Sequence, residues 1–391
     1  MLQVRSFLLP SVLIYGTGSS AQAGEELGKL GLKKGLAVTD QVISRLGLMD
    51  DLLKSLAASK IEAAVYDKVA TEPTVDYVNE GLDVYKKKGC EFVLAFGGGG
   101  SAIDTAKAVA TMATNQGSIE TFKGLNKVPK PSAPLIAIPT TAGTGSEVTV
   151  FTIITDTKTD VKMLIGSPHM LPRVAIVDPS LTLSCPRSLT AAVGIDALTH
   201  AIEAYVSIKA QPMSDLFAMS AIGLISSSLR QAWADGNNIE AREKTMLGAM
   251  HAGIAFCNAS VALVHGMSRP IGAYFHVPHG ASNAALLSVV TEFSLMGNPA
   301  RYAAIARALG ENVSGMNEME GAQLAAKAIN NLIKDIKIPS LKELGVTRSK
   351  LEELAPTMAD AAIDSGSPGN NPRKATKEEI MELYMRTFDR P

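Results

Sequence analysis

The segment FVLAFGGGGSAIDTAK, residues 92–107, joins a short apolar run to four consecutive glycines and then to a sequence with helical character. A β-branched and aromatic run that ends at glycine is typical of a buried strand. Glycines allow a ligand to approach the backbone closely, and the free N–H groups at the start of the next helix attract an anion. The segment therefore predicts a strand, a phosphate-binding loop and a helix. Because it lacks the G-x-G-x-x-G pattern, it indicates a phosphate or nucleotide site in general, and a purely structural turn is the alternative.

Four further runs, at residues 12–15, 36–39, 135–138 and 174–177, have the same strand character. Between two of them, residues 74–88 place apolar side chains at spacings of three and four, as one buried face of a helix does. Alternating strands and helices of this kind build a parallel sheet covered by helices. The N-terminal half is therefore predicted to be an α/β domain with a Rossmann-like parallel sheet.

The pattern changes after Asp178-Pro179, where Ala-rich helical segments follow one another at residues 189–206, 215–233, 241–256 and 300–309. Successive helices without strands predict an all-helical domain. We place the boundary at Cys185-Pro186, which gives an α/β domain at residues 1–185 and a helical domain at residues 186–391. A chain of 391 residues accommodates two such domains at about 150 residues or more each.

Composition excludes several classes of partner. Lys and Arg number 37 against 38 for Asp and Glu, so no field of one sign attracts nucleic acid or an anionic membrane. No apolar run reaches the roughly 18 to 20 residues that a membrane span needs. The N-terminus imitates a signal peptide, but Pro10 interrupts its apolar stretch and residues 12–15 have strand character. Three widely spaced cysteines indicate a reducing compartment, and we expect a cytoplasmic protein.

Two other features near strand ends suggest a dinucleotide. Asp40 ends the strand at residues 36–39, where a carboxylate can accept hydrogen bonds from an adenosine ribose, although an Asp in this place is usually an N-cap. The segment PTTAGTGSE, residues 139–147, follows another strand and is rich in hydroxyl groups and backbone donors. Two such loops favour a dinucleotide over a mononucleotide.

The helical half contains a candidate metal centre. Asp196 and His200 are four residues apart on a predicted helix, so both side chains lie on one face. His265 follows an apolar helical run, and His279 opens another segment after Pro278. One carboxylate and three imidazoles suit Fe(II), Zn or a similar divalent cation with a position left for substrate. An isolated histidine is more often structural, so the prediction depends on the four residues together.

The motifs GGGGSAIDTAK, PTTAGTGSE, GIDALTHAIEAY and HGMSRPIGAYFHVPHG resemble the iron-containing alcohol dehydrogenase family, in particular its lactaldehyde reductase and small-alcohol branch. The resemblance implies a fold of the dehydroquinate synthase type, with a nucleotide-binding domain followed by a helical metal-binding domain. It also implies two cofactors, NAD(H) and a divalent metal, for which Fe(II) is expected in preference to Zn, and a homo-oligomer. The metal ligands that it implies are Asp196, His200, His265 and His279. The implied cofactor contacts are Asp40, Gly98, Gly99, Ser101, Asp104, Thr140, Thr141, Ser146 and Lys162.

One position departs from the family pattern. Many relatives have a second histidine four residues after the third metal ligand, and here that position is Arg269. His276 is then a candidate for the proton route, with a structural role as the alternative. Arg269 itself is a candidate for binding an anionic substrate, although it can instead pack under its loop. Pro270 disfavours a helix at this point.

The predicted reaction is hydride transfer between a nicotinamide and a small aldehyde whose carbonyl a metal polarises. Three alternatives remain at this point: a reductase of an anionic aldehyde (a sulfo-, phosphono- or carboxy-aldehyde), a polyol dehydrogenase or dehydroquinate synthase-like lyase, and a protein that binds a nucleotide and an ion without turnover.

Overall fold

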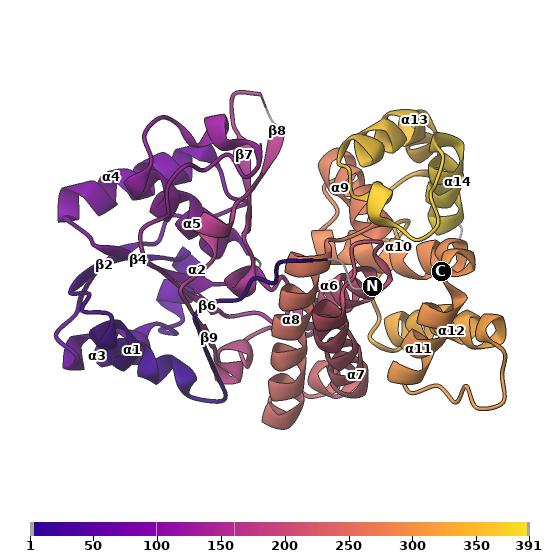
Figure 1. Ribbon diagram of the computed structural model, residues 1–391, viewed down its shortest axis with the longest axis horizontal. Helices are drawn as coiled ribbons and strands as arrows, with labels where there is room; N and C mark the ends of the chain where they lie inside the picture. The colour runs from indigo at the N-terminus through magenta and orange to yellow at the C-terminus, as the bar shows by residue number, and fades with distance from the viewer. Residues whose placement is uncertain (1–3, 99, 160, 389–391) are drawn as a thin grey trace. The chain divides into compact units, whose positions relative to one another are not determined.

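The N-terminal half of the chain is built on six parallel strands in the order β1-β9-β6-β4-β2-β3 (Figure 1). Their bounds are β1 (Val12–Tyr15), β2 (Lys34–Val38), β3 (Glu62–Tyr66), β4 (Phe92–Gly97), β6 (Leu135–Pro139) and β9 (Val174–Val177). The computed structural model describes residues 4–98, 100–159 and 161–388. It confirms the five predicted strands and adds β3, which pairs with β2 at the edge of the sheet.

The strand order reverses between β2 and β4. From β2 the chain continues outward to β3, whereas from β4 it continues the other way through β6 and β9. In open parallel sheets, ligands bind at the carboxyl ends of the strands beside such a reversal. Here those ends are followed by Asp40 on one side and by the glycine loop on the other.

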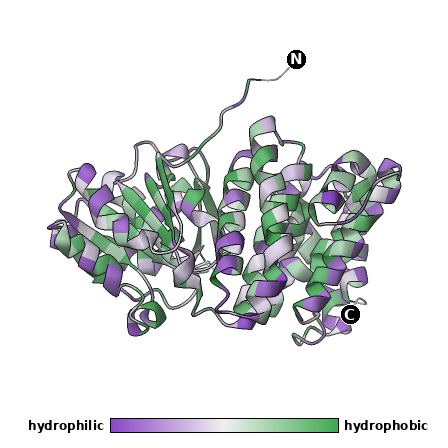
Figure 2. Cartoon of the chain, turned by 90° about the horizontal axis from the view of Figure 1, so that it is seen from below, coloured by the Kyte–Doolittle hydropathy of each residue, from purple (hydrophilic) through white to green (hydrophobic). Residues whose placement is uncertain are grey.

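Each face of this sheet carries its own core, because neighbouring residues of a strand point to opposite sides. Val93 and Ala95 of β4 belong to a cluster with helices α4 and α5, whereas Leu94 and Phe96 belong to a cluster with α1 and α3. Figure 1 shows these two pairs of helices on opposite sides of the sheet, and Figure 2 shows the strands mostly in the hydrophobic colour. The helices of this half are α1 (Ala23–Lys29), α2 (Gln41–Arg45), α3 (Asp50–Ala58), α4 (Val75–Lys88) and α5 (Ser101–Thr114).

A second, three-stranded sheet follows the glycine loop along the chain and was not predicted from the sequence. It contains β5 (Gly124–Leu125), β7 (Phe151–Asp156) and β8 (Val161–Gly166), in the order β5-β8-β7. The pair β7 and β8 is antiparallel, while β5 and β8 run parallel. Short 3-10 helices lie at η1 (Ser19–Gln22), η2 (Ile119–Phe122), η3 (Ser146–Val148), η4 (Pro168–Met170), η5 (Pro179–Thr182), η6 (Leu295–Gly297) and η7 (Pro368–Asn370).

The C-terminal half is helical, and α6 lies at its centre. Helix α6 packs on α7, α8 and α10 and is buried on most of its surface. A cluster of buried alanines lies where α6, α7 and α8 meet, and small side chains let helices approach closely. The helices are α6 (Arg187–Val206), α7 (Pro212–Ala234), α8 (Ile239–Ala259), α9 (Leu263–Phe275), α10 (His279–Ser294), α11 (Pro299–Ala308), α12 (Glu318–Asp335), α13 (Arg348–Asp364) and α14 (Lys377–Phe388).

Contacts within the chain define two units. One is Leu8–Ser184, and the other is Cys185–Pro391 together with Met1–Phe7. Among the described residues, no single helix has the length and apolar character to cross a membrane, although α8 and α9, which are bent by 105° at their junction, pass that test when taken as a pair.

Candidate functional site

Three side chains from three helices of the second unit bring their ligand atoms together. They are Asp196 on α6, His265 in the first turn of α9 and His279 at the start of α10, and their ligand atoms all lie within 4.8 Å of one another. The Oδ1 atom of Asp196 is 3.6 Å from Nε2 of each of the two histidines. Ligands held about 2.1 Å from a tetrahedral cation are about 3.4 Å apart, so this spacing fits a divalent metal.

A glycine allows α10 to reach the cluster. A Cβ atom on Gly280 would lie 2.3 Å from the carbonyl oxygen of Ala192 on α6, so only glycine permits this contact. The contact places His279 beside α6. Its side chain is 48% exposed, whereas those of Asp196 and His265 are each 4% exposed, so His279 forms the open side of the cluster.

His200 lies one turn after Asp196 and its ring stacks between two others. Its centroid is 4.4 Å from that of His265 and 4.2 Å from that of Phe256. Its Nδ1 atom is buried and has no hydrogen-bond partner among the described residues. The ligand atoms that lie within 4.8 Å of one another do not include either ring nitrogen of His200, so among the described residues the structure brings three of the four predicted metal ligands together.

The electrostatics of the cluster also suit a cation. Burial lowers the pKa of His200 to about 3, so its imidazole is neutral and keeps a lone pair. Burial alone would raise the pKa of Asp196, but His200, His279 and His265 hold it below its ordinary value. A neutral imidazole and an ionised carboxylate are the forms that bind metals.

Glu203 fixes the orientation of His265 and was not assigned a role from the sequence. It is buried on α6, and its Oε2 atom accepts a hydrogen bond from Nδ1 of His265 at 2.6 Å. Its carboxylate also accepts the backbone N–H groups of Val264 at 2.5 Å and of His265 at 3.4 Å. Burial alone would lower the pKa of His265, but its hydrogen bonds to Asp196 and Glu203 raise it. In the neutral ring, with Nδ1 donating to Glu203, Nε2 has the lone pair that faces the cluster. The signal in the sequence is an acid seven residues after Asp196, on the same face of an apolar helix.

The glycine loop and the hydroxyl-rich loop of the first unit touch each other. They follow adjacent parallel strands, with Gly97 of β4 opposite Pro139 of β6. A Cβ atom on Gly98 would lie 2.6 Å from Cγ2 of Thr141 and 3.1 Å from Oγ1 of Thr140. The structure therefore brings these predicted cofactor residues together beside Ser101, the first residue of α5. Gly99 lies outside the described residues.

Asp40 caps α2 and faces the glycine loop. Its Oδ1 atom accepts the backbone N–H of Ile43 at 2.9 Å, as the N-cap alternative anticipated. Its Oδ2 atom lies 3.9 Å from the place where a Cβ of Gly97 would be. Asp40 and the glycine loop thus flank the reversal of strand order.

Asp104 and Ser146 bond to each other, and Ser146 also contacts a buried lysine, Lys107, to which no role was assigned from the sequence. Oγ of Ser146 donates to Oδ1 of Asp104 at 2.6 Å, and the N–H of Ile153 donates to Oδ2 at 2.8 Å. Nζ of Lys107, which has no exposed surface, donates to Ser146, Thr149 and the carbonyl of Phe151 at 3.0, 2.9 and 2.7 Å. Burial raises the pKa of Asp104, and the charge of Lys107 counteracts this effect. These groups already have protein partners, so the network joins α5 to η3 and β7.

Three remaining candidates lie outside these clusters. Lys162 on β8 is 42% exposed and forms an ion pair with Glu72 at 2.6 Å. His276 is exposed and ends α9 in the left-handed backbone region. Arg269 donates to Oγ of Ser367 at 3.2 Å; burial lowers the pKa of its guanidinium, while the charge of Glu203 raises it.

The expectation that Pro270 disfavours a helix at this point was wrong, because α9 continues through it. Pro270 and Ile271 are both buried, so packing of this face offsets the hydrogen bond that proline cannot donate.

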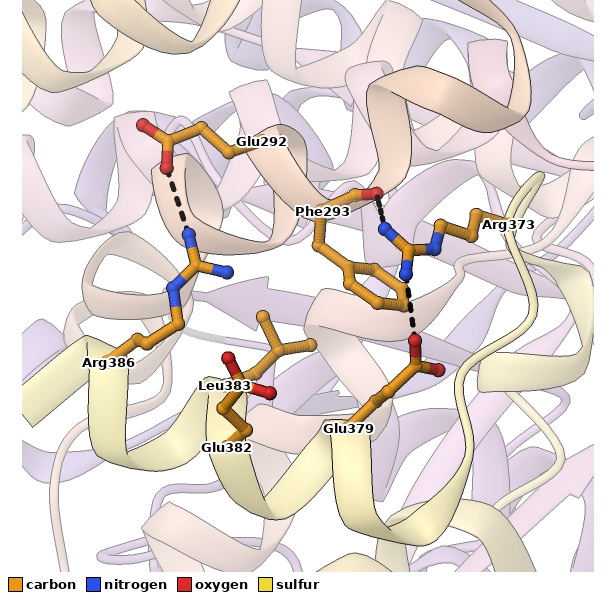
Figure 3. Close-up of a pocket in the computed structure, with 7 residues that line it drawn as sticks. All are labelled: Glu292, Phe293, Arg373, Glu379, Glu382, Leu383 and Arg386. Carbon is orange, nitrogen blue, oxygen red and sulfur yellow. Dashed lines mark hydrogen bonds and ion pairs between the residues drawn. The ribbon is translucent and has the colours of Figure 1, made fainter.

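A surface pocket lies at the other end of α10 from His279, roughly 20 Å along the helix at 1.5 Å per residue. Figure 3 shows Arg373 over the ring of Phe293 and two ion pairs, Arg373 with Glu379 and Arg386 with Glu292. None of the candidate site residues lines this pocket. Four of its five charged side chains form these two ion pairs, and the pair of Arg386 and Glu292 joins α14 to α10.

Two family models match the chain. The model described as iron-containing alcohol dehydrogenase matches residues 10–179, and the model of the C-terminal part of the Fe-containing alcohol dehydrogenase family matches residues 190–388.

Relatives match over nearly the whole chain. A 1,3-propanediol dehydrogenase of Citrobacter freundii is 41% identical and an NAD-dependent methanol dehydrogenase of Bacillus methanolicus is 39% identical, with 98% and 97% of this chain covered and 98% of each relative. A crystal structure of a 1,3-propanediol oxidoreductase is 40% identical, with a TM-score of 0.96 over 99% of this chain and 100% of that one.

Proposed function

Because the chain belongs to the iron-containing alcohol dehydrogenase family, we propose that Asp196, His200, His265 and His279 hold one divalent cation, Fe(II) before Zn, for the reduction of a small aldehyde. The enzyme is an NAD(H)-linked alcohol dehydrogenase and aldehyde reductase; its relatives include an NAD-dependent methanol dehydrogenase and a lactaldehyde reductase. The observation that best supports this metal centre is that the ligand atoms of Asp196, His265 and His279 lie within 4.8 Å of one another.

In this proposal, residues of the chain bind and orient the cofactor and the metal. Once bound, NAD(H) would carry the hydride and the cation would act as a Lewis acid toward the substrate oxygen. Asp196 supplies a negative charge that offsets part of the cation's charge. We assign the diphosphate of the cofactor to the loop at Gly98, Ser101, Thr140 and Thr141, where backbone N–H groups and hydroxyls meet at the start of α5.

The partners of Arg269 favour a neutral substrate over an anionic one. Its guanidinium donates to Ser367, and the negative charge of Glu203 raises its pKa against the effect of burial, so protein groups already interact with it. We therefore propose a short neutral aldehyde as substrate. Three widely spaced cysteines are typical of a protein in a reducing compartment, and we propose a cytoplasmic homo-oligomer.

A panel of short aldehydes with NADH tests this function on protein reconstituted with Fe(II) under anaerobic conditions. We expect loss of NADH absorbance with propanal and little with sulfoacetaldehyde or succinic semialdehyde. A protein that only binds nucleotide and ion would consume no NADH with any aldehyde in the panel.

Replacing Asp40 with asparagine should abolish most of a preference for NAD(H) over NADP(H). A carboxylate beside a 2′-phosphate places like charges together, which costs about 1 to 3 kcal/mol and corresponds to a preference of about ten- to a hundredfold. Asparagine keeps an acceptor for the N–H of Ile43, so the cap of α2 is retained while the charge is removed. The measurement is kcat/KM with each coenzyme. Equal efficiency with both coenzymes in the wild-type enzyme would refute the assignment of Asp40.

Replacing Glu203 with glutamine should weaken metal binding by about ten- to a hundredfold, as is usual when a carboxylate partner of a ligating histidine is changed. Glutamine has one carbonyl oxygen for the three N–H groups that Glu203 now accepts, and its NH₂ group would oppose one of them. Zn(II) affinity by competition with a chelating dye is the measurement. Glu240→Gln on the exposed side of α8 is the control, and an unchanged affinity in Glu203→Gln would exclude the orienting role.

A further inference from the structure

One buried amide nitrogen contacts three of the four proposed metal ligands. Asn283 lies one turn after His279 on α10 and has no exposed surface. Its Nδ2 atom is 2.7 Å from Oδ1 of Asp196, 3.2 Å from Nε2 of His265 and 3.3 Å from Nε2 of His279. These are the same three atoms that would face a cation.

The chemistry of Asp196 determines which end of the amide faces the cluster. An ionised carboxylate only accepts hydrogen bonds, and the NH₂ group of asparagine only donates them. The opposite orientation would place two acceptor oxygens against each other. The Oδ1 atom of Asn283 is buried and has no hydrogen-bond partner among the described residues, so turning the amide breaks no hydrogen bond at that end.

The amide and a cation need the same lone pairs on the histidines. A neutral imidazole has one donor and one acceptor nitrogen. In the neutral ring of His265, Nδ1 donates to Glu203 and the single lone pair is on Nε2, which is 3.2 Å from Nδ2 of Asn283. That lone pair cannot accept the amide N–H and bind a metal together. Asp196 differs, because a carboxylate oxygen has a further lone pair and can keep the amide while it binds a cation.

We propose that Asn283 takes the place of the cation in the metal-free enzyme. Its two N–H groups, one of them shared between two acceptors, hold Asp196, His265 and His279 at ligand spacing and partly offset the charge of Asp196. On metal binding the amide turns away from the two imidazoles and keeps its bond to Asp196. This inference rests on the proposed function, because it takes the four residues as metal ligands.

The proposal predicts the direction in which the Zn(II) affinity changes when Asn283 is replaced. A residue that stabilised the bound metal would give a change in the opposite direction. A group that binds mainly the metal-free state opposes metal binding, so its removal destabilises the metal-free protein more than the loaded one. Asn283→Ala should lower the melting temperature of the metal-free protein and enlarge the rise in melting temperature on adding Zn(II). The dissociation constant for Zn(II) should therefore become tighter, by up to about tenfold, the equivalent of one typical hydrogen bond.

Asn371→Ala is a matched control. Asn371 is also buried in the helical unit, but it donates to Ser294 and to the carbonyl of Arg373, away from the ligands. It should lower the stability of both states equally and leave the Zn(II) constant unchanged.

Crystal structures of the wild-type protein with and without Zn(II) test the turn itself and do not depend on a variant that folds. The inference expects Nδ2 within 3.5 Å of Nε2 of His265 only in the metal-free crystal. An Nδ2 atom that stays at that distance in the loaded crystal would overturn this inference while leaving the metal centre intact. A Zn(II) constant that is unchanged or weaker in Asn283→Ala would do the same. A wild-type protein that binds no Zn(II) would overturn the metal centre as well.

Discussion

The variant His265→Ala is expected to lower kcat/KM for aldehyde reduction by at least about a thousandfold, because loss of the Lewis acid removes several kcal/mol of transition-state stabilisation. His265 is buried, contributes one of the converging ligand atoms and is oriented by Glu203. The affinity for NADH should stay within a few-fold of wild type, since the proposed cofactor loops belong to the other unit. Steady-state kinetics and NADH titration of the purified variant measure these two quantities. Metal analysis shows whether the variant is free of metal.

His251→Ala is the matched control for this experiment. His251 lies on α8 in the same unit, bonds to Ser220 and stacks at the edge of Phe217, outside the ligand cluster. Its replacement should leave the metal content unchanged. A His265→Ala protein that is free of metal and still turns over at the wild-type rate would contradict the metal mechanism.

The variant Lys107→Met is expected to lower the free energy of unfolding by about 3 to 5 kcal/mol, because each buried acceptor that is left without its donor costs about 1 to 3 kcal/mol. The lysine has no exposed surface and donates three hydrogen bonds, and its charge counteracts the burial of Asp104. Methionine fills a similar volume but donates nothing, so Asp104 loses its cation and three acceptors lose a donor. The midpoint of urea unfolding is the measurement.

Lys87→Met on the exposed side of α4 is the control and should change stability by no more than about 0.5 kcal/mol. Adding Asp104→Asn to Lys107→Met should recover part of the loss, because it removes the uncompensated charge. Additive losses in the double variant would show that the two charges do not interact.

Local patterns predicted the elements that carry the chemistry. Strand β4, its glycine loop and α5 could be predicted because an apolar run, four glycines and a helical period are adjacent in the chain. The pair of Asp196 and His200 was visible for the same reason, as two residues four apart on one helix. Strand order could not be predicted, because pairing between β2 and β4 depends on contacts across more than fifty residues of chain.

The roles that the sequence did not reveal all depend on contacts between distant segments. Glu203 meets His265 across 62 residues, Lys107 meets Thr149 across 42, and Asn283 meets Asp196 across 87. Each is a polar residue in an apolar helix, which indicates that a partner exists but does not identify it. Pro270 failed as a helix breaker because tertiary packing outweighs local preference at a buried position.

Metal titration of activity tests the central claim most directly. Wild-type protein is stripped with a chelator, Fe(II) is added in steps under anaerobic conditions, and both bound metal and NADH consumption with propanal are measured at each step. We expect no consumption in the stripped protein and a rate that rises in proportion to bound Fe(II) until one cation is bound per chain. Stripped protein that reduces propanal at the full rate would contradict a metal-dependent mechanism at Asp196, His200, His265 and His279.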